Sequence, residues 1–177
     1  AKVREALGPD VALDSWSLLF DPANAAKLAA CGISVLDDEQ ETFGAALLFR
    51  GRDPNALTGD ETQVVTDTYA AVRKHIRYFN SSKYIDDLAN GDLCLVMGYS
   101  GDIFQAGDRA EEAKNGVEIQ YIIPREGALR WFDLIAIPAD APHKANAHAF
   151  IDYLLKPEVA AGVSDFVASA TPNTAAL

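Results

Sequence analysis

The chain has 177 residues, with 26 acidic and 15 basic side chains and a formal net charge of -11 at pH 7. This excess of acid argues against nucleic acids and anionic membranes as partners, because both repel a negatively charged surface. The length suffices for one large core or two small ones, and the sequence lacks the apolar run of about 18 residues that a membrane-spanning helix needs.

Helices are predicted to alternate with short strands, which indicates an α/β fold. Asp21-Pro22 is typical of a helix start, with Asp as the cap and Pro in the first turn. In chain order, the patterns predict a helix closed by Gly8-Pro9, an apolar loop over 16–20, a helix over 22–30, a strand over 33–36, a helix capped by Asp37 or Asp38, a loop over 51–59, a helix over 60–74, a strand over 76–79, and a short helix capped by Ser81-Ser82 and ending at Asn90-Gly91.

The stretch from Leu93 to Phe104 is the most informative part of the chain. A buried-type strand over 93–97 is followed by Gly98 and then by a helix that ends at Asn115-Gly116. Ligands bind at the carboxyl ends of strands in open α/β sheets, and here that end delivers Tyr99 and Asp102. Because the protein itself places an acid at this helix start, the position suits a cation.

After Gly116 the apolar residues alternate with period two, which predicts strands over 117–123 and 129–137. The second strand places Trp131 and Asp133 on one apolar face. An aspartate on such a face is costly unless it is paired or functional. Two helices, roughly over 143–155 and 157–168, and a polar loop over 169–177 complete the chain.

Three acids and two aromatic residues form the candidate site: Glu41, Tyr99, Asp102, Trp131 and Asp133. Carboxylates give charge-assisted hydrogen bonds to an ammonium group, and aromatic faces cover a polymethylene chain while attracting its cationic ends. This combination predicts recognition of an amine.

Four of these residues also have a purely structural interpretation. Glu41 and Asp102 are acids in the first turns of helices, where the helix dipole favours them. Trp131 is equally consistent with a core residue, and Asp133 with an ion pair to Arg130.

Cys31 and Cys94 each border or lie in an apolar segment. They fit two buried thiols or one disulfide between neighbouring strands, which would indicate an oxidising compartment. We predict the disulfide, since Cys31 precedes the 33–36 strand and Cys94 lies in the 93–97 strand. Two distant cysteines and three histidines do not suggest zinc, so we expect no metal site and no cofactor.

The motifs of common enzymes are missing: there is no G-x-S-x-G, no P-loop and no G-x-G-x-x-G. We therefore expect a binding protein without catalytic activity. Two hypotheses from other classes stay open. One is a hydrolase that uses an acid pair such as Glu41 and Asp102. The other is a scaffold or self-associating piece that binds no ligand.

Several motifs resemble a known family over essentially the whole chain. These motifs are SWSLLFDP at 15–22, IRYF at 76–79, SS at 81–82, DDLANGD at 86–92, GYSGD at 98–102, AKNGV at 113–117, and IPREGA at 123–128 with WFD at 131–133. They resemble the periplasmic polyamine-binding proteins of bacterial ABC importers, the putrescine and spermidine receptors. The resemblance implies a hinged, two-lobed solute-binding fold, location in the periplasm, and delivery of a polyamine to the permease subunits of an ABC transporter.

The same resemblance implies a division of the chain and a role for each candidate residue. Residues 1–114 correspond to most of the second lobe, 115–128 to the hinge or crossover, and 129–177 to an incomplete segment that returns to the first lobe. The receptors of this family are considerably longer, so the resemblance implies an internal fragment. The aromatic and acidic ligand-binding positions of the family match Tyr99 with Asp102, Trp131 with Asp133, and Glu41.

We also expect the candidate site to discriminate between ligands of different chain length. Two separated acid groups with aromatic walls between them select the length of a linear polycation, because each cationic end of the ligand needs a carboxylate. The large indole of Trp131 favours an extended ligand, so we expect spermidine-like triamines to be preferred over putrescine.

Overall fold

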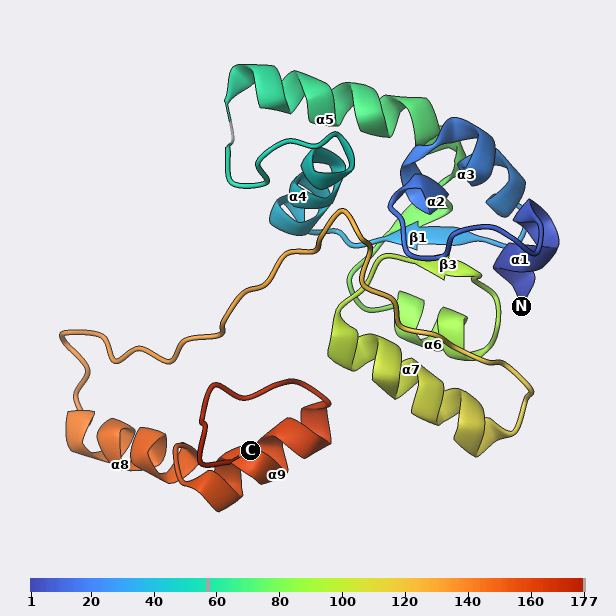
Figure 1. Cartoon of the computed structure of the whole chain (residues 1–177). Helices are drawn as coiled ribbons and strands as arrows, with labels where there is room; N and C mark the ends of the chain where they lie inside the picture. Colours follow the sequence, from blue (N-terminus) through green and yellow to red (C-terminus); the bar gives the residue numbers. More distant parts are fainter. Residues whose placement is uncertain (57, 177) are drawn as a thin grey trace. The chain divides into compact units, whose positions relative to one another are not determined.

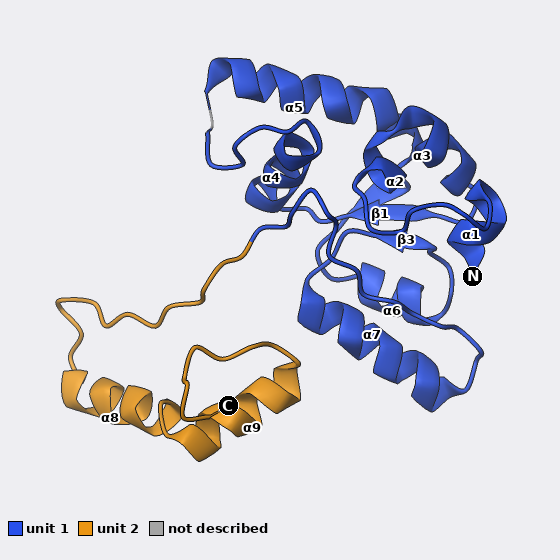
Figure 2. Cartoon of the chain, in the orientation of Figure 1, with its two compact units in different colours: residues 1–129 blue, residues 130–177 orange. Residues whose placement is uncertain are grey.

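The computed structural model describes residues 1–56 and 58–176. Leu57, within the predicted loop 51–59, and Leu177, at the end of the predicted returning segment, lie outside the described residues. The chain divides into two compact units, residues 1–129 and 130–177, shown in Figure 2.

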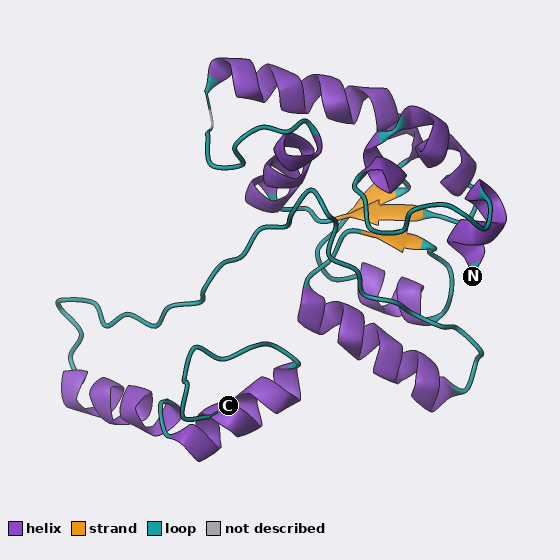
Figure 3. Ribbon diagram, viewed as in Figure 1, coloured by secondary structure: helices purple, strands orange, loops and turns teal. Residues whose placement is uncertain are grey.

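Unit 1 is built around a parallel sheet of three short strands in the order β2-β1-β3 (Figure 3). The strands are β1 (Ile33–Val35), β2 (Tyr78–Phe79) and β3 (Leu95–Val96). Ser34 of β1 pairs in register with both outer strands, opposite Tyr78 and Val96. All three residues of β1 are buried, as expected of a central parallel strand covered on both faces. The predicted α/β fold is confirmed.

Helices cover both faces of this sheet; α3 and α5 lie on one side of it and α6 and α7 on the other (Figure 1). Asp21 caps α3 by accepting the N–H groups of Ala23 and Asn24, as the sequence predicts. The helices of unit 1 are α1 (Lys2–Leu7), α2 (Ser17–Phe20), α3 (Pro22–Leu28), α4 (Glu39–Phe49), α5 (Gly59–Val72), α6 (Tyr84–Ala89) and α7 (Ser100–Ala113), with a 3₁₀ turn at Arg73–His75.

Two local predictions in unit 1 were wrong. The expected loop over 16–20 is the short helix α2, because a helical turn buries Leu18, Leu19 and Phe20 together against the core. The expected cap of α6 by Ser81-Ser82 is not formed, since the N-cap residue is Lys83 and no side chain caps the helix. Asn80 Oδ1 accepts the N–H groups of Ser82 and Lys83, while the Ser81 hydroxyl accepts the N–H of Asp37.

The strands predicted over 117–123 and 129–137 are also absent from the described residues. Alternating apolar residues give a strand one buried face, but the backbone still needs a neighbouring strand to pair its N–H and C=O groups. No described strand pairs with either segment, so both run as irregular chain.

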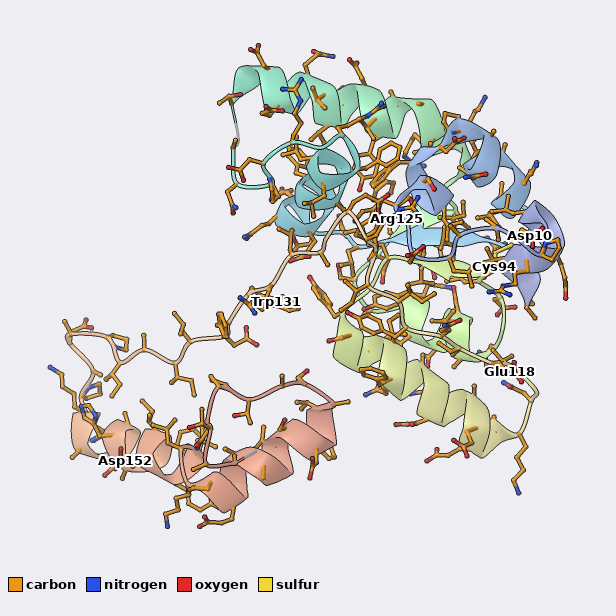
Figure 4. All side chains as sticks on the ribbon, in the orientation of Figure 1. Asp10, Cys94, Glu118, Arg125, Trp131 and Asp152 are labelled. Carbon is orange, nitrogen blue, oxygen red and sulfur yellow. A yellow bond between two sulfur atoms is a disulfide. The ribbon has the colours of Figure 1, made fainter. Side chains whose placement is uncertain are left out.

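Cys31 and Cys94 form a disulfide with a Cα–Cα distance of 5.5 Å, which confirms the prediction. The bond joins the residues that precede β1 and β3, at the amino end of the sheet (Cys94 is labelled in Figure 4). It closes a loop with a sequence separation of 63 residues. The crosslink therefore ties the central strand to one of its neighbours.

Unit 2 contains an extended segment followed by the helices α8 (Lys144–Leu154) and α9 (Pro157–Val167). Both helices agree with the predicted ranges to within about two residues. The Asn173 side chain donates to the Leu155 carbonyl at 2.7 Å and holds the last turn against the end of α8. No residue of α8 or α9 is buried, and large apolar side chains such as Leu134 and Phe166 are 88% and 90% exposed.

Across residues 1–56 and 58–176, no helix combines the length and the apolar character that crossing a membrane requires.

We expect reduction of the Cys31–Cys94 bond to lower the free energy of unfolding of unit 1 by about 4 kcal/mol, the entropy that a crosslink of this loop length removes from the unfolded chain. Denaturant unfolding with and without reductant measures this loss, and intact mass with alkylation identifies the bond. The C31S/C94S variant is the control, because reductant must leave its stability unchanged. Two alkylatable thiols in the unreduced chain would contradict the assignment.

Candidate functional site

Three turns meet at the carboxyl edge of the sheet, where β1, β2 and β3 all end. They are the connections from β1 to α4, from β2 to α6 and from β3 to α7. Parallel strands place such turns side by side, which makes this edge the usual ligand position of an open α/β sheet. The turns after β1 and β3 carry the acidic and aromatic residues described next.

Asp38 and Glu41 lie at the start of α4. Asp38 caps the helix, and its Oδ1 accepts the N–H of Glu41 at 2.9 Å. Partial burial raises the pKa of Glu41 above its ordinary value of 4.5, and the negative charge of Asp38 raises it further. Both causes make the ionised form of Glu41 less favourable than that of an ordinary glutamate, and a nearby positive charge acts in the opposite direction.

Tyr99 connects the turn after β3 with the start of α4. Its hydroxyl donates to Asp38 Oδ2 at 3.2 Å. Burial and the carboxylate of Asp38 raise the pKa of Tyr99 to about 12, so the phenol stays protonated at neutral pH and remains a donor. This hydrogen bond holds the ring of Tyr99 next to the carboxylate of Asp38, although the two residues are 61 positions apart in sequence.

Asp102 is held in place by Tyr84 of α6. The Tyr84 hydroxyl donates to Asp102 Oδ2 at 2.5 Å and accepts the backbone N–H of Tyr99 at 3.2 Å. Tyr84 is completely buried, and a Cβ at Gly98 would lie 2.6 Å from its ring. Glycine at 98 therefore leaves room for the phenol that positions Asp102.

In the described part of the chain, the ion pairs lie away from this edge: Arg52–Glu61, Lys83–Asp87, Arg109–Asp86 and Arg125–Asp14. None of them neutralises Asp38, Glu41 or Asp102. Three carboxyl groups gathered at one edge, with the phenol of Tyr99 beside them, are a suitable environment for a cationic ligand. The described residues contain no cluster of three or more His, Cys, Asp or Glu side chains arranged to hold a metal ion.

Trp131 and Asp133, the other two predicted site residues, belong to unit 2. Trp131 is 50% exposed, so it is not buried in a core of its own unit (it is labelled in Figure 4). Asp133 forms no ion pair with Arg130 in the described part of the chain; the Arg130 guanidinium lies 6.0 Å from the Phe132 ring instead. Their role in the site stays a prediction.

The structure thus brings Glu41, Tyr99 and Asp102 to one edge of one sheet and adds two residues that sequence reasoning did not select. Asp38 carries a recognisable signal, since it follows a buried strand just as Tyr99 does. Tyr84 carries none, because only packing of α6 beside β3 brings its hydroxyl to Asp102.

An open groove of about 530 Å³ lies elsewhere in unit 1, between α7 and residues 116–121. Phe104 and Tyr121 meet there with ring centroids 5.4 Å apart. None of the acids described above lines the groove. The groove is therefore separate from the candidate site.

Comparison with known proteins places these features in a family. The family model of bacterial extracellular solute-binding proteins matches residues 2–177. The putrescine-binding periplasmic protein PotF of Escherichia coli is 48% identical over 176 residues, covering 99% of this chain and 48% of the relative. The putrescine-binding periplasmic protein SpuD of Pseudomonas aeruginosa is 46% identical over 175 residues, with 99% and 48% coverage.

Among solved structures, a putative spermidine/putrescine ABC transporter protein from Listeria monocytogenes superposes with a TM-score of 0.78 at 28% identity. The match covers 99% of this chain and 50% of that one. The chain spans about half the length of the curated relatives it matches. The match over nearly every residue, together with the parallel α/β fold, shows that the chain belongs to the family of bacterial extracellular solute-binding proteins.

Proposed function

We propose that this chain binds a linear polyamine, putrescine or spermidine, and takes part in its delivery to an ABC importer without catalysing a reaction. The observation that carries the proposal is the cluster of Asp38, Glu41 and Asp102 with Tyr99 at the carboxyl edge of the sheet. The names of the two relatives describe putrescine-binding periplasmic proteins, which supports a polyamine as the ligand.

The chemistry of the cluster suits an alkylammonium group. An ammonium group donates up to three hydrogen bonds, and charge-assisted bonds to carboxylates are about twice as strong as neutral ones. The Tyr99 ring adds a surface for methylene groups and for the cation itself. Asp38 and Glu41 on one turn, with Asp102 on the next, supply more negative charge than one ammonium group needs.

We further propose that Trp131 and Asp133 complete the site from the other lobe. In this proposal residues 1–114 are the second lobe, 115–128 the crossover, and 129–177 the segment returning to the first lobe. The exposed apolar side chains of unit 2 support this division, because isolated soluble units rarely expose so many of them.

The permease subunits of an ABC transporter are the proposed partners, and the periplasm is the proposed location. A disulfide agrees with that compartment, since such bonds persist where the surroundings are oxidising. The hydrolase that would use Glu41 and Asp102 as an acid pair gains no support from the relatives, whose names describe binding. A family of solute-binding proteins likewise favours binding over a purely structural scaffold.

Titration of putrescine and spermidine into the chain, followed by NMR, tests the proposed ligand class. We expect saturable shifts of the amides of Asp38, Glu41, Tyr99 and Asp102. The E41Q and D102N variants each remove one charged partner and should weaken binding about tenfold or more, because a hydrogen bond to a charged group contributes about 1.5–3 kcal/mol.

Matched controls are E39Q on α4 and D108N on α7, which remove the same charge from exposed positions on the same two helices. Both should retain the affinity of the unaltered chain. Shifts with a sugar or a neutral amino acid, and none with any di- or triamine, would contradict the proposal.

Binding should also release protons in the pH range just above 4.5. The raised pKa of Glu41 means that the free chain holds more of this proton than an ordinary glutamate does, and an adjacent ammonium group lowers that pKa again. Calorimetry at one pH in two buffers of different ionisation enthalpy counts the protons released.

As the pH falls through the raised pKa, Glu41 becomes protonated and the affinity should fall. The E41Q variant should lose the buffer dependence, whereas E39Q should keep it. Binding heats that are independent of the buffer in the unaltered chain would show that Glu41 does not meet the ligand.

The spermidine-to-putrescine affinity ratio tests the role of Trp131. We propose a preference for the triamine, because the acids at 38, 41, 102 and 133 outnumber the two charges of a diamine. Trp131→Phe and Trp131→Ala should lower the ratio stepwise as the aromatic wall shrinks. Phe132→Ala, at a neighbouring exposed aromatic, is the control. An unchanged ratio in both Trp131 variants would remove this residue from the site.

A further inference from the structure

Residues 124–129 are fastened to the loop before α2, more than a hundred positions earlier in the chain. Glu126 Oε1 accepts the Ser15 hydroxyl at 2.5 Å, and Oε2 accepts the Trp16 N–H at 3.3 Å. The Trp16 indole N–H donates to the Gly127 carbonyl at 2.9 Å. Ser15 is only 4% exposed, so the carboxylate reaches into the edge of the core.

Two further observations show that this attachment is specific. The N–H of Arg125 donates to the Asp14 carbonyl at 2.9 Å (Arg125 is labelled in Figure 4). Burial alone raises the pKa of Glu126, but the hydrogen bonds from Ser15 and Trp16 outweigh it and hold the pKa below its ordinary value of 4.5. The carboxylate of Glu126 is therefore ionised at neutral pH, and its hydrogen bonds are charge-assisted.

Leu129 makes a second attachment, on helix α4. A Cβ at Gly44 would lie 2.4 Å from Leu129 Cδ1, so the leucine side chain occupies the space that glycine leaves open. Gly44 lies one turn after Glu41 of the candidate site, and Leu129 is the last residue of unit 1. We call the contacts of Glu126 with Ser15 and Trp16, together with Leu129 at Gly44, the crossover clasp.

We propose that the crossover clasp is a positioning device for the ligand site. It fixes the point at which the chain leaves unit 1, and so limits how far Trp131 and Asp133 can move from that point. This inference rests on the proposed polyamine function, since it assigns those two residues to the ligand. The clasp residues themselves do not bind the ligand in this proposal.

Chain geometry explains why the anchor matters. The attachments at Glu126 and Leu129 lie three positions apart, so together they fix both the position and the direction in which the chain leaves unit 1. An extended chain advances at most about 3.6 Å per residue. Trp131 therefore lies within about 7 Å of chain path from anchored Leu129, and Asp133 within about 14 Å. Release of the clasp lengthens that path back to residue 124 and lets both side chains reach many more positions.

Hydrogen exchange of the backbone tests whether the clasp fixes the exit. We expect Glu126→Ala to speed exchange of the amides of residues 125–130 about tenfold, while the amides of β1 and β3 keep their rates. Trp16→Phe, which removes the indole donor and keeps a ring, should have a smaller effect in the same place. Glu118→Gln, an exposed acid before the clasp, is the control and should change nothing.

A size exchange at the second attachment provides an independent variant that keeps helix α4 intact, since alanine favours a helix more than glycine does. Gly44→Ala should displace Leu129, and Leu129→Ala should leave the space empty, so each should speed exchange at 128–130. The G44A/L129A double variant should recover part of the protection, because the new methyl fills the vacated space. Gly107→Ala on α7, where an added Cβ meets nothing within 4 Å, is the matched control.

Polyamine affinity of the same variants separates positioning from stability. We expect Glu126→Ala and Gly44→Ala to bind spermidine several-fold more weakly at temperatures where both are fully folded. The amides of Glu41 and Asp102 should still shift on binding, and G44A/L129A should regain affinity.

Unchanged exchange at 125–130 in both Glu126→Ala and Gly44→Ala overturns the clasp. Faster exchange with unchanged affinity overturns its positioning role. Failure of the unaltered chain to bind any polyamine overturns the proposed function and the ligand role together, while the exchange rates still decide whether the clasp fixes the exit.

Discussion

Parallel pairing of β1 with both β2 and β3 is the constraint on which the candidate site depends. Parallel strands end at the same edge, so the turns that follow them are neighbours although they are distant in sequence. The turn after β1 delivers Asp38 and Glu41, and the turn after β3 delivers Tyr99 and Asp102. The disulfide at the opposite end ties the same two strands together, so the pairing that forms the site is also covalently supported.

At that edge, uncharged groups hold the acids in place. These groups are phenol hydroxyls: Tyr84 donates a hydrogen bond to Asp102, and Tyr99 donates one to Asp38. An arginine or lysine in either position would neutralise the carboxylate and compete with a cationic ligand. The pKa of Glu41 is raised first by partial burial and then by the nearby negative charge of Asp38.

The route from this edge to unit 2 runs through residues 124–129. Their attachments reach two other parts of unit 1, the loop before α2 and the middle of α4. Because α4 also carries Glu41, the helix that presents a candidate ligand group receives the last residue before unit 2 as well. This shared helix is a direct physical connection between the candidate site and residues 124–129.

The sequence by itself determined the α/β class, most helix positions and three of the acidic and aromatic residues at the sheet edge, whereas the predicted disulfide needed the pairing of β1 with β3 to confirm it. These follow from local patterns: apolar periodicity, Asp-Pro and Gly signals at helix ends, and polar residues directly after buried strands. Only the tertiary structure decided the helix over 17–20, the start of α6 without a serine cap, and the part played by Tyr84. It also decided that residues 117–123 and 129–137 form no strands, despite their alternation. The physical reason is the same in each case: burial, capping and strand pairing depend on partners that lie far away in sequence, and a local pattern does not specify those partners.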